Sequence, residues 1–303
     1  MRAVVIGGSG QIGGALLRAL GERGHEAIGT YATVPYPGLT RLDAADLGSA
    51  GGWVCAQSPD VVFYPAGFTW VDGCEKDPER AAAANLLQPF LIASAAAETG
   101  ARFVYFSTDY VFDGRGGPYT EDAPTNPLSA YGHSKRDAEV VLAHKLGDRA
   151  LTVRTSWVFG PEWQGKNFAY QVVRALAAGK PMVVPIDQIS SPGYGPDVAS
   201  AVVALVEQGR SGLVHVVGPE VMGRLDFARA IAKGFGLDAG LVTGKTTEAL
   251  GQGAPRPLNG GLSTPKLGEW LPGAMRPLAE CLADFRGRLS APGSYFADPF
   301  RPA

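Results

Sequence analysis

The sequence predicts an α/β protein whose sheet is mostly parallel, doubly wound and covered by helices on both faces. Two observations lead to this fold class. Short apolar runs alternate with segments of helical periodicity through the N-terminal half, and a glycine-rich turn joins the first run to the first helical segment. The 303 residues, 46% hydrophobic and 18% charged, suffice for one large domain or for two closely packed ones.

Strands and helices are expected to alternate along the N-terminal half. The apolar runs predict buried strands at 2–6, 26–30, 60–64, 102–107 and 151–155. Between the first two, Ile12, Leu16 and Ala19 recur at helical spacing, and Gly24 ends that helix. Longer helices are expected at 79–98, which is rich in alanine, and at 131–146. Helical crossovers between strands favour parallel pairing.

The pattern loosens after residue 159. Stretches rich in Gly, Pro, Ser and Asn predict loops at 160–166, 186–196 and 251–265, separated by expected helices at 168–178, 197–207 and 225–236 and a strand at 212–217. We therefore expect a dinucleotide-binding domain of the Rossmann type at 1–160 and a smaller C-terminal α/β substrate-binding lobe at 161–303. The strand at 212–217 is free to return to the first sheet.

The glycine-rich turn is the first candidate functional motif. Its glycines allow a tight turn, close approach of a pyrophosphate, and packing of the helix on the strand. The N-terminus of the following helix supplies N–H donors and a partial positive charge for phosphates. Glycine turns also occur for structural reasons alone, but the position between strand and helix favours a dinucleotide. The expected cofactor-binding residues are Gly7, Gly10, Gln11, Ile12 and Gly13.

The residues after the second expected strand bear on the choice of cofactor. That strand ends in Gly29-Thr30-Tyr31, without the acidic residue that binds a ribose 2′-hydroxyl in NAD enzymes. No arginine follows directly to bind a 2′-phosphate, so NADP(H) is favoured and NAD(H) stays open. Asp43, followed by Ala44, is a candidate for the adenine amino group. The alternative is that Asp43 caps a helix beginning at Ala44.

Tyr131 and Lys135 are the candidate catalytic pair. They are four residues apart on an expected helix, so both side chains project from one face. Free tyrosine has a pKa of about 10. A neighbouring ammonium stabilises the phenolate, which is expected to bring the pKa toward the working range of a proton donor. The YxxxK spacing alone is common on surface helices, so its weight depends on the neighbouring motifs.

A hydroxyl and a carboxylate follow the expected strand at 102–107. Thr108 and Asp109 stand at its carboxyl end, and ligands of open α/β sheets bind at that edge. Thr108 is therefore placed to hydrogen-bond a substrate carbonyl while Tyr131 donates a proton. The glycine turn, the strand-end hydroxyl and the YxxxK pair occur in the order and on the elements that an oxidoreductase of this fold requires.

Several classes of function and site are not expected. The net charge of −2 without a basic block disfavours nucleic-acid and membrane-surface partners, and no apolar run approaches the ~20 residues of a membrane span. The first strand begins at once, without a signal-peptide pattern, and the three cysteines are odd in number, so we expect a cytoplasmic protein. The cysteines and histidines follow no metal-ligand spacing, so no metal site is expected: Cys55, Cys74, Cys281, His25, His133, His144 and His215.

Longer segments resemble one family closely. They are 107–114 (Ser-Thr-Asp-Tyr-Val-Phe-Asp-Gly), 127–135 (Pro-Leu-Ser-Ala-Tyr-Gly-His-Ser-Lys) and 154–161 (Arg-Thr-Ser-Trp-Val-Phe-Gly-Pro), with shorter matches at 165–168, 187–192 and 255–257. On these residues the chain resembles the extended short-chain dehydrogenase/reductases, and among them the dTDP-4-dehydrorhamnose reductases. The resemblance spans nearly the whole chain.

The resemblance implies reduction of the 4-keto group of a dTDP-linked 6-deoxyhexose. It implies that Thr108 and Asp109 contact the sugar, that Tyr131 is the acid, and that Lys135 holds the nicotinamide ribose and tunes Tyr131. Further residues fall where the family holds its cofactor, namely Gly10, Gln11, Ile12, Asp43, Ala66, Gly67 and Thr69. Trp157 is implied near the sugar, and Asn167 and Arg256 near the nucleotide. The resemblance also admits a homodimer.

Two segments depart from the family pattern. Residues 64–70 replace the usual Asn-Ala-Ala-Ala run and end in the bulky Trp70, and residues 259–263 differ from the usual Asn-Ser-Arg/Ala-Leu stretch. The exact sugar therefore stays open. Two other classes stay open as well: a non-catalytic regulatory subunit like the methionine adenosyltransferase beta subunit, and another sugar-nucleotide epimerase or dehydratase. Because Asp109 is followed by Tyr110 rather than by a second acid, a dehydratase is disfavoured.

Overall fold

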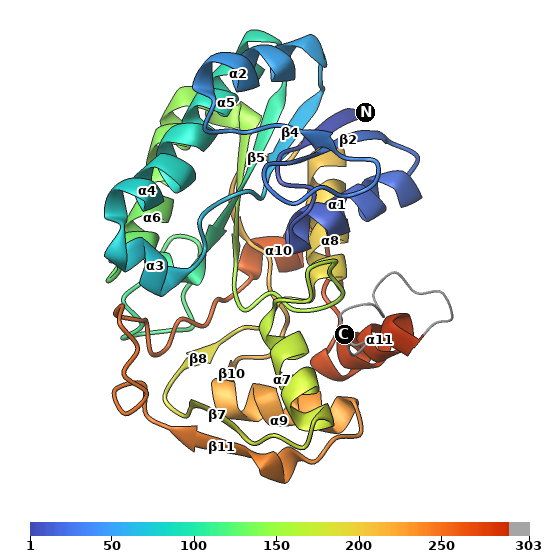
Figure 1. Cartoon of the computed structure of the whole chain (residues 1–303). Coiled ribbons are helices and arrows are strands. Elements are labelled where there is room, and N and C mark those ends of the chain that lie inside the picture. Colours follow the sequence, from blue (N-terminus) through green and yellow to red (C-terminus); the bar gives the residue numbers. More distant parts are fainter. Residues whose placement is uncertain (291–303) are drawn as a thin grey trace.

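A seven-stranded parallel sheet forms the centre of the larger of two lobes in the computed structural model, which describes residues 1–290 (Figure 1). Its strands lie in the order β3 (Thr40–Arg41), β2 (Glu26–Tyr31), β1 (Arg2–Val5), β4 (Val61–Tyr64), β5 (Arg102–Thr108), β6 (Ala150–Thr155) and β9 (Gly212–His215). The order reverses at β1, between β2 and β4. Such a switch point opens a crevice at the carboxyl ends of these strands, and the predicted fold class is confirmed.

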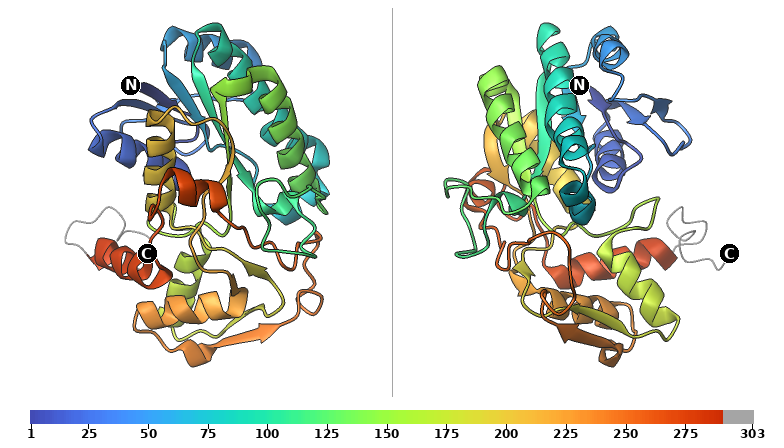
Figure 2. Two further views of the ribbon diagram at one scale, coloured as in Figure 1. Left: turned by 180° about the vertical axis from the view of Figure 1, so that it is seen from behind. Right: turned by 60° about the vertical axis from the view of Figure 1, so that its left-hand side comes forward.

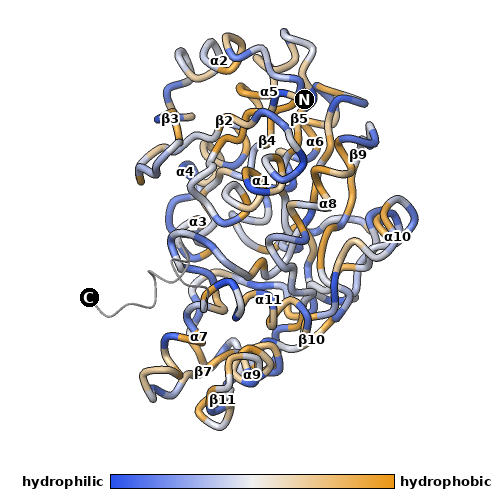
Figure 3. Tube along the Cα trace, turned by 90° about the vertical axis from the view of Figure 1, so that its right-hand side faces the viewer, coloured by the Kyte–Doolittle hydropathy of each residue, from blue (hydrophilic) through white to orange (hydrophobic). Residues whose placement is uncertain are grey.

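Helices cover both faces of this sheet (Figure 2). On one face α1 (Gln11–Glu22) packs against α8 (Gly195–Glu207), and on the other lie α2 (Leu47–Ala56), α5 (Gln88–Glu98) and α6 (Ala130–Leu146). The central strands therefore consist of apolar residues on both faces, and all four residues of β4 are buried. In Figure 3 the orange of hydrophobic residues lies along the central strands.

The smaller lobe is built on two short sheets (Figure 1). The strands β7 (Met182–Pro185) and β11 (Val242–Lys245) pair in parallel, and β8 (Ile189–Ser190) and β10 (Met222–Gly223) pair antiparallel. Three helices complete the lobe, α7 (Phe168–Ala177), α9 (Arg224–Gly234) and α11 (Leu278–Ser290). Its separate core is aromatic at the centre, with Phe159, Tyr170, Phe227 and Phe285 fully buried.

The two lobes interleave along the chain. The apolar side of α8, with Val198 and Val202 buried, packs against α1, and β9 then pairs with β6. The short helix α10 (Pro265–Trp270) also contacts β9. We therefore propose that residues 195–217 and 265–270 join residues 1–160 in the larger lobe, although the loop pattern after residue 159 had assigned the expected helix at 197–207 to the smaller one.

The long helix expected at 79–98 has three parts. These are α4 (Pro78–Ala82), a single π-helical turn η1 (Ala83–Leu87), and α5. The π-helical turn carries Asn85, which is buried and whose side chain bonds both backbone groups of Phe68 and the hydroxyl of Ser134. The polar partners of Asn85 thus accompany the local departure from α-helical geometry.

Several short elements were not expected from the sequence. They are α2, α3 (Val71–Lys76), α10, α11, the strands β3, β7, β8, β10 and β11, and the short turns η2 (Asp109–Val111), η3 (Gly147–Arg149) and η4 (Ala239–Leu241). The helix α2 contains Gly48, Gly51 and Gly52, which have low helix propensity. It packs against α5, so tertiary contact stabilises what local propensity does not.

The described residues contain no helix long and apolar enough to cross a bilayer. Within the same range no three His, Cys, Asp or Glu side chains gather where they would hold a metal ion. The three cysteines are free thiols, and Cys74 and Cys281 are buried.

Candidate active site

A cleft of about 1040 Å³ runs along the carboxyl ends of β1, β4, β5 and β6 and is bounded on its far side by the smaller lobe. It brings together the candidate cofactor-binding residues Gly7, Gly10, Gln11, Ile12, Gly13, Asp43, Ala44, Ala66, Gly67 and Thr69. The same cleft is lined by Thr108, Asp109, Tyr131, Lys135, Trp157 and Asn167. Of the candidate site residues, Arg256 alone does not line the cleft.

The glycine-rich turn has the geometry of a phosphate cradle. Gly7 has a φ of +92°, a conformation that other residues adopt only under strain, and a Cβ at Gly13 would overlap the carbonyl oxygen of Gly7. Gly10 is the N-cap of α1 and provides no side-chain cap, and no acidic residue stands in the first turn. The N-terminal N–H groups of α1 therefore face the cleft without a side-chain acceptor, as an anionic ligand requires.

Two buried polar atoms in the cleft have no partner among the described residues. They are the side-chain nitrogen Nε2 of Gln11 and the hydroxyl of Ser107. Nearly all buried polar groups in folded proteins are hydrogen-bonded. The orphaned atoms, together with the uncapped helix and the glycine cradle, fit a dinucleotide lying along the cleft.

Asp43 does not cap a helix. The helix α2 begins at Leu47, and its N-cap is Asp46, whose carboxylate accepts from the backbone N–H of Ser49. The alternative interpretation, a helix beginning at Ala44, is therefore wrong. Asp43 is exposed at the edge of the cleft and accepts from the backbone N–H of Ala45 at 2.9 Å.

Thr108 and Tyr131 meet where β5 ends. The hydroxyl of Thr108 accepts from the backbone N–H of Tyr110, and it lies near enough to the phenol of Tyr131 to lower the pKa of that phenol. Tyr131 has 8% of its surface exposed, and the ring of Tyr110 packs edge-on against it with 5.6 Å between centroids. The phenol of Tyr131 and the hydroxyl of Thr108 therefore both face the same part of the cleft.

The start of α6 is fixed by close backbone contact. Ser129 is its N-cap and accepts from the N–H of Gly132, and the carboxylate of Glu75 accepts from the N–H of Ala130. A Cβ at Gly132 would overlap the carbonyl oxygen of Tyr110. A glycine at this position thus lets the first turn of α6 approach the end of β5, which brings Tyr131 to Thr108.

Lys135 lies one turn further along α6. Its side chain is buried, with 4% exposed, and its ammonium lies 4.1 Å from the centroid of the Tyr105 ring. The hydroxyl of Tyr105 donates to the backbone carbonyl of Asn85 at 2.7 Å, so the ring is held in place. The described residues provide no hydrogen-bond acceptor for the ammonium, which leaves its donors directed at the cleft.

Burial dominates the titration of both catalytic candidates. It raises the pKa of Tyr131 well above its ordinary value, and only the hydroxyl of Thr108 opposes this. Burial lowers the pKa of Lys135 to about 7, against the raising effect of Glu139 and Cys74. The expectation that the ammonium brings the pKa of Tyr131 down toward neutrality is therefore not met in this structure, because burial dominates that pKa.

Asp109 is enclosed by hydroxyl groups. Ser156 and Ser190 donate to its Oδ2 at 2.9 and 2.8 Å, and Thr108 donates to its Oδ1 at 3.2 Å. Burial raises the pKa of Asp109 to about 6, and these hydrogen bonds lower it in part. Because Ser190 belongs to β8, the carboxylate at the end of β5 ties the larger lobe to the smaller one.

The three candidate substrate residues differ in their surroundings. Trp157 follows β6 and has a φ of +39°, a strained value that functional sites often hold. The side chain of Asn167 caps α7 and donates to the carbonyl of Gly160. Arg256 forms an ion pair with Asp72 at 2.9 Å and donates to the backbone carbonyl of Ala254.

Sequence reasoning missed four polar residues around these side chains. Ser107 ends the expected strand at 102–107 and Ser156 follows the expected strand at 151–155; both line the cleft, and a search for hydroxyls at strand ends would have found them. Ser190 ends β8. Asn85 was hidden in an alanine-rich helix, where a single amide is an inconspicuous signal. Asn85 and Ser190 become recognisable only through their partners, Phe68 and Asp109.

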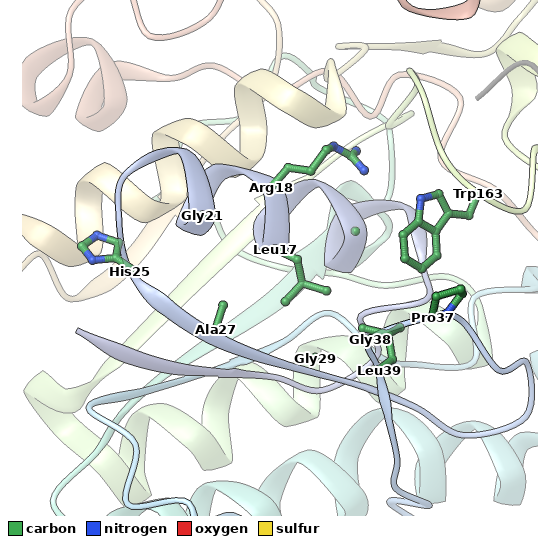
Figure 4. A pocket seen from close by; sticks show the side chains of 11 residues that line it. Leu17, Arg18, Gly21, His25, Ala27, Gly29, Pro37, Gly38, Leu39 and Trp163 are labelled. Atoms are coloured by element: carbon green, nitrogen blue, oxygen red, sulfur yellow. The ribbon is translucent and has the colours of Figure 1, made fainter. Parts of the chain in front are cut away.

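A strap from the smaller lobe, residues 162–166, reaches the cofactor side of the cleft. Gln164 donates to the carbonyl of Ser9 at 3.0 Å, and Trp163 stacks on Tyr36 with 4.2 Å between centroids. Figure 4 shows Trp163 beside Pro37, at the edge of a groove of about 360 Å³ next to α1. The strap thus fastens the smaller lobe across the glycine-rich turn.

Comparison with known proteins shows the family of this chain. The profile described as the RmlD substrate binding domain matches residues 1–289. The chain belongs to this family. It is 35% identical over 259 residues to the spore coat polysaccharide biosynthesis protein SpsK of Bacillus subtilis, covering 84% of this chain and 87% of that protein.

Other relatives of the RmlD family carry reductase names. The dTDP-4-dehydrorhamnose reductase of Mycobacterium tuberculosis is 32% identical over 300 residues, covering 97% of this chain and 94% of that one. The crystal structure of dTDP-4-dehydrorhamnose reductase from Bacillus anthracis in complex with NADP superposes with a TM-score of 0.86 at 27% identity, covering 94% of this chain and 98% of that chain. The resemblance predicted from the sequence is confirmed.

Proposed function

We propose that this protein reduces the 4-keto group of a nucleotide-linked 6-deoxyhexose, in the manner of a dTDP-4-dehydrorhamnose reductase, with NADPH as the favoured reductant and NADH as the alternative. One observation carries the proposal: Thr108, Tyr131 and Lys135 line the same cleft as a glycine-rich phosphate cradle. Membership of the RmlD family and relatives named for this reaction support it.

The residues of the cleft suit the dinucleotide. Gly7, Gly10 and the first N–H groups of α1 would hold its diphosphate, with Gln11, Ile12 and Gly13 beside it. Asp43 and Ala44 would line the adenine, and Ala66, Gly67 and Thr69 the middle of the molecule. When bound, the nicotinamide supplies the hydride. The relative from Bacillus anthracis contains NADP, and no acidic residue stands at 30–33 of this chain, which favours NADPH.

Tyr131 is the proposed proton donor. Since burial raises its pKa, the phenol stays protonated over the whole neutral range and is ready to donate to the carbonyl oxygen. Thr108 hydrogen-bonds the same oxygen and directs it toward the phenol. Lys135, partly charged near neutral pH, donates to the ribose and stabilises the phenolate that proton transfer leaves behind.

Asp109 and Trp157 complete the proposed sugar site. Asp109 offers an oxygen to a sugar hydroxyl while Ser156 and Ser190 fix its position. The indole of Trp157 lines the cleft and offers an apolar face to the sugar ring. Asn167 and Arg256 are the candidates for the nucleotide, although both side chains are engaged by protein groups in this structure.

The decisive experiment follows oxidation of NADPH and of NADH with a panel of nucleotide-linked 4-keto sugars, dTDP-4-keto-6-deoxyhexose among them. We expect turnover with the dTDP-linked sugar and a preference for NADPH. Tight cofactor binding without turnover of any keto sugar would instead support the regulatory-subunit interpretation. Clearly tighter NADH binding would overturn the cofactor preference.

The setting of the enzyme is also a proposal. We place it in the cytoplasm, where reducing conditions suit its three free thiols. A homodimer is the expected assembly, and light scattering after size exclusion tests it.

A further inference from the structure

Arg224 presents a guanidinium that no hydrogen-bond acceptor within residues 1–290 uses. It is the first residue of α9, and its backbone N–H donates to the carbonyl of Gln188 at 2.8 Å. The guanidinium carbon lies 3.6 Å from the ring centroid of Phe168 and 4.5 Å from that of Trp157. A guanidinium carries five N–H donors, and the part of the chain that the structure describes provides none of them with a hydrogen-bond acceptor.

Two other arginines, the buried Arg154 and the partly exposed Arg276, are paired with carboxylates. Arg154 forms two hydrogen bonds with Glu139 at 2.9 and 2.7 Å, and Arg276 binds both Asp197 and Asp284. Arg224 has aromatic faces in place of carboxylates. The two rings fix the plane of the guanidinium without using its N–H donors, which remain available for a ligand.

Arg224 does not itself line the cleft, but its guanidinium lies against the ring of Trp157, which does. Burial lowers its pKa to about 10, and the nearby charges of Tyr110 and Asp109 oppose that shift. The charges of Arg224 and Arg256 both lower the pKa of Tyr110, which burial raises. Trp157, Tyr110 and Asp109 all line the cleft. A desolvated cation beside a ligand cleft, without a carboxylate of its own, favours an anionic ligand.

We propose that Arg224 binds the diphosphate of the nucleotide-linked sugar, with Trp157 and Phe168 holding its guanidinium in place. The inference rests on the proposed function, whose substrate carries a diphosphate directly on the sugar that Asp109 and Trp157 contact. The planar fork of N–H groups matches phosphate oxygens in pairs, which a neutral sugar hydroxyl cannot do. Arg224 comes from the smaller lobe, so the diphosphate would join that lobe to the catalytic residues of the larger one.

The test compares ligands with and without phosphate. With NADP⁺ saturating, dTDP binding is measured by calorimetry and thymidine binding by ligand-observed NMR, for wild type, Arg224→Met and Arg224→Lys. Arg224→Met keeps the length and packing of the side chain but removes the charge. We expect it to weaken dTDP binding roughly 10- to 100-fold and to leave thymidine and NADP⁺ binding unchanged, while Arg224→Lys retains part of the dTDP affinity.

The matched control is Arg229→Met, on the same helix, exposed and bonded only to the backbone carbonyl of Val242. It should bind dTDP like the wild type. A folded Arg224→Met variant with wild-type dTDP affinity would overturn the inference while leaving the proposed reduction intact. Equal losses for dTDP and thymidine would overturn it too, because they indicate displacement of Trp157. Wild-type protein that binds neither dTDP nor UDP would contradict the substrate class itself.

Discussion

At the scale of single residues, burial rather than ion pairing dominates the pKa values of the catalytic candidates. The phenol of Tyr131 and the ammonium of Lys135 are both removed from water, and each pKa moves toward the neutral form. A neutral phenol is an effective donor to a ketone but a poor base. The protonated phenol of Tyr131 therefore suits reduction of a ketone better than oxidation of an alcohol.

The proton donor can be removed with little change in packing. In Tyr131→Phe the ring still packs against Tyr110, but the hydroxyl beside Thr108 is lost. We expect turnover of the keto sugar to fall ~10²–10⁴-fold, because general-acid catalysis contributes that much. Cofactor affinity should change little. Steady-state rates and NADPH titration check both, and undiminished turnover would refute the role of Tyr131.

The lowered pKa of Lys135 leads to a prediction about how the free energy of unfolding depends on pH. Its value falls from 10.5 in the unfolded chain to about 7 in the folded one, so between these values the unfolded chain binds more protons. The contribution of Lys135 to the free energy of unfolding therefore rises with pH above 7, by up to about 1.4 kcal/mol per pH unit. Lys135→Met lacks this dependence, so its stability advantage over wild type should be larger at pH 7 than at pH 9.

Urea unfolding of both proteins at the two pH values measures that difference. A gap between Lys135→Met and wild type that stays constant from pH 7 to pH 9 would show that the ammonium keeps an ordinary pKa in the folded protein. The groups common to both proteins cancel in the comparison.

At the scale of elements, helix ends position the site. The N-terminus of α1 carries the glycine cradle, and the N-terminus of α6 carries Tyr131. Each approach needs a glycine, at Gly13 and at Gly132, where a Cβ would overlap a backbone carbonyl. The two helices thus come close enough to the strand ends for their first turns to face one cleft.

A side chain introduced at Gly10 would occupy the expected diphosphate site in the glycine-rich turn. Gly10→Val places a branched side chain at the start of α1, where we expect the diphosphate, and its Cβ would lie 3.3 Å from the carbonyl oxygen of Gly7. We expect NADPH affinity to fall at least ~10-fold while the circular dichroism spectrum is kept. Gly21→Ala is the control in the same helix, since a Cβ there meets no atom within 4 Å. Normal NADPH binding by folded Gly10→Val would make the turn merely structural.

At the scale of the whole molecule, the cleft exists because two lobes are held at a fixed distance. Asp109 with Ser190, and Asp72 with Arg256, connect them near the catalytic residues. The strap connects them on the cofactor side through Trp163 and Gln164. Cofactor affinity is therefore expected to depend on residues of the smaller lobe that are distant in sequence from the glycine-rich turn.

A double-mutant cycle on Tyr36 and Trp163 tests the strap. Stacked aromatic pairs contribute about 0.5–1.5 kcal/mol beyond their buried area. We expect Trp163→Ala and Tyr36→Ala each to weaken NADPH binding several-fold, and the double variant to be hardly weaker than either single one. Additive losses in the NADPH titration would show that the stack does not hold the strap over the cofactor.

The local sequence determined the elements that are specified by residues close together in the chain. The glycine-rich turn, the apolar strands and the Thr108, Tyr131 and Lys135 motifs were all recognisable, because strand burial and helical spacing are properties of neighbouring residues. Chain order alone then placed these motifs at the carboxyl ends of parallel strands. The fold class and the family followed from the same segments.

Only the tertiary structure decided which distant residues meet. Ser190 reaches Asp109 across 81 positions, Gln164 reaches Ser9 across 155, and Arg224 lies between two rings from other segments. Such contacts depend on packing between lobes, which leaves no periodic trace in the sequence. The shifted pKa values of Tyr131 and Lys135 were decided there as well, because desolvation depends on everything packed around a group and not on its own neighbours in the chain.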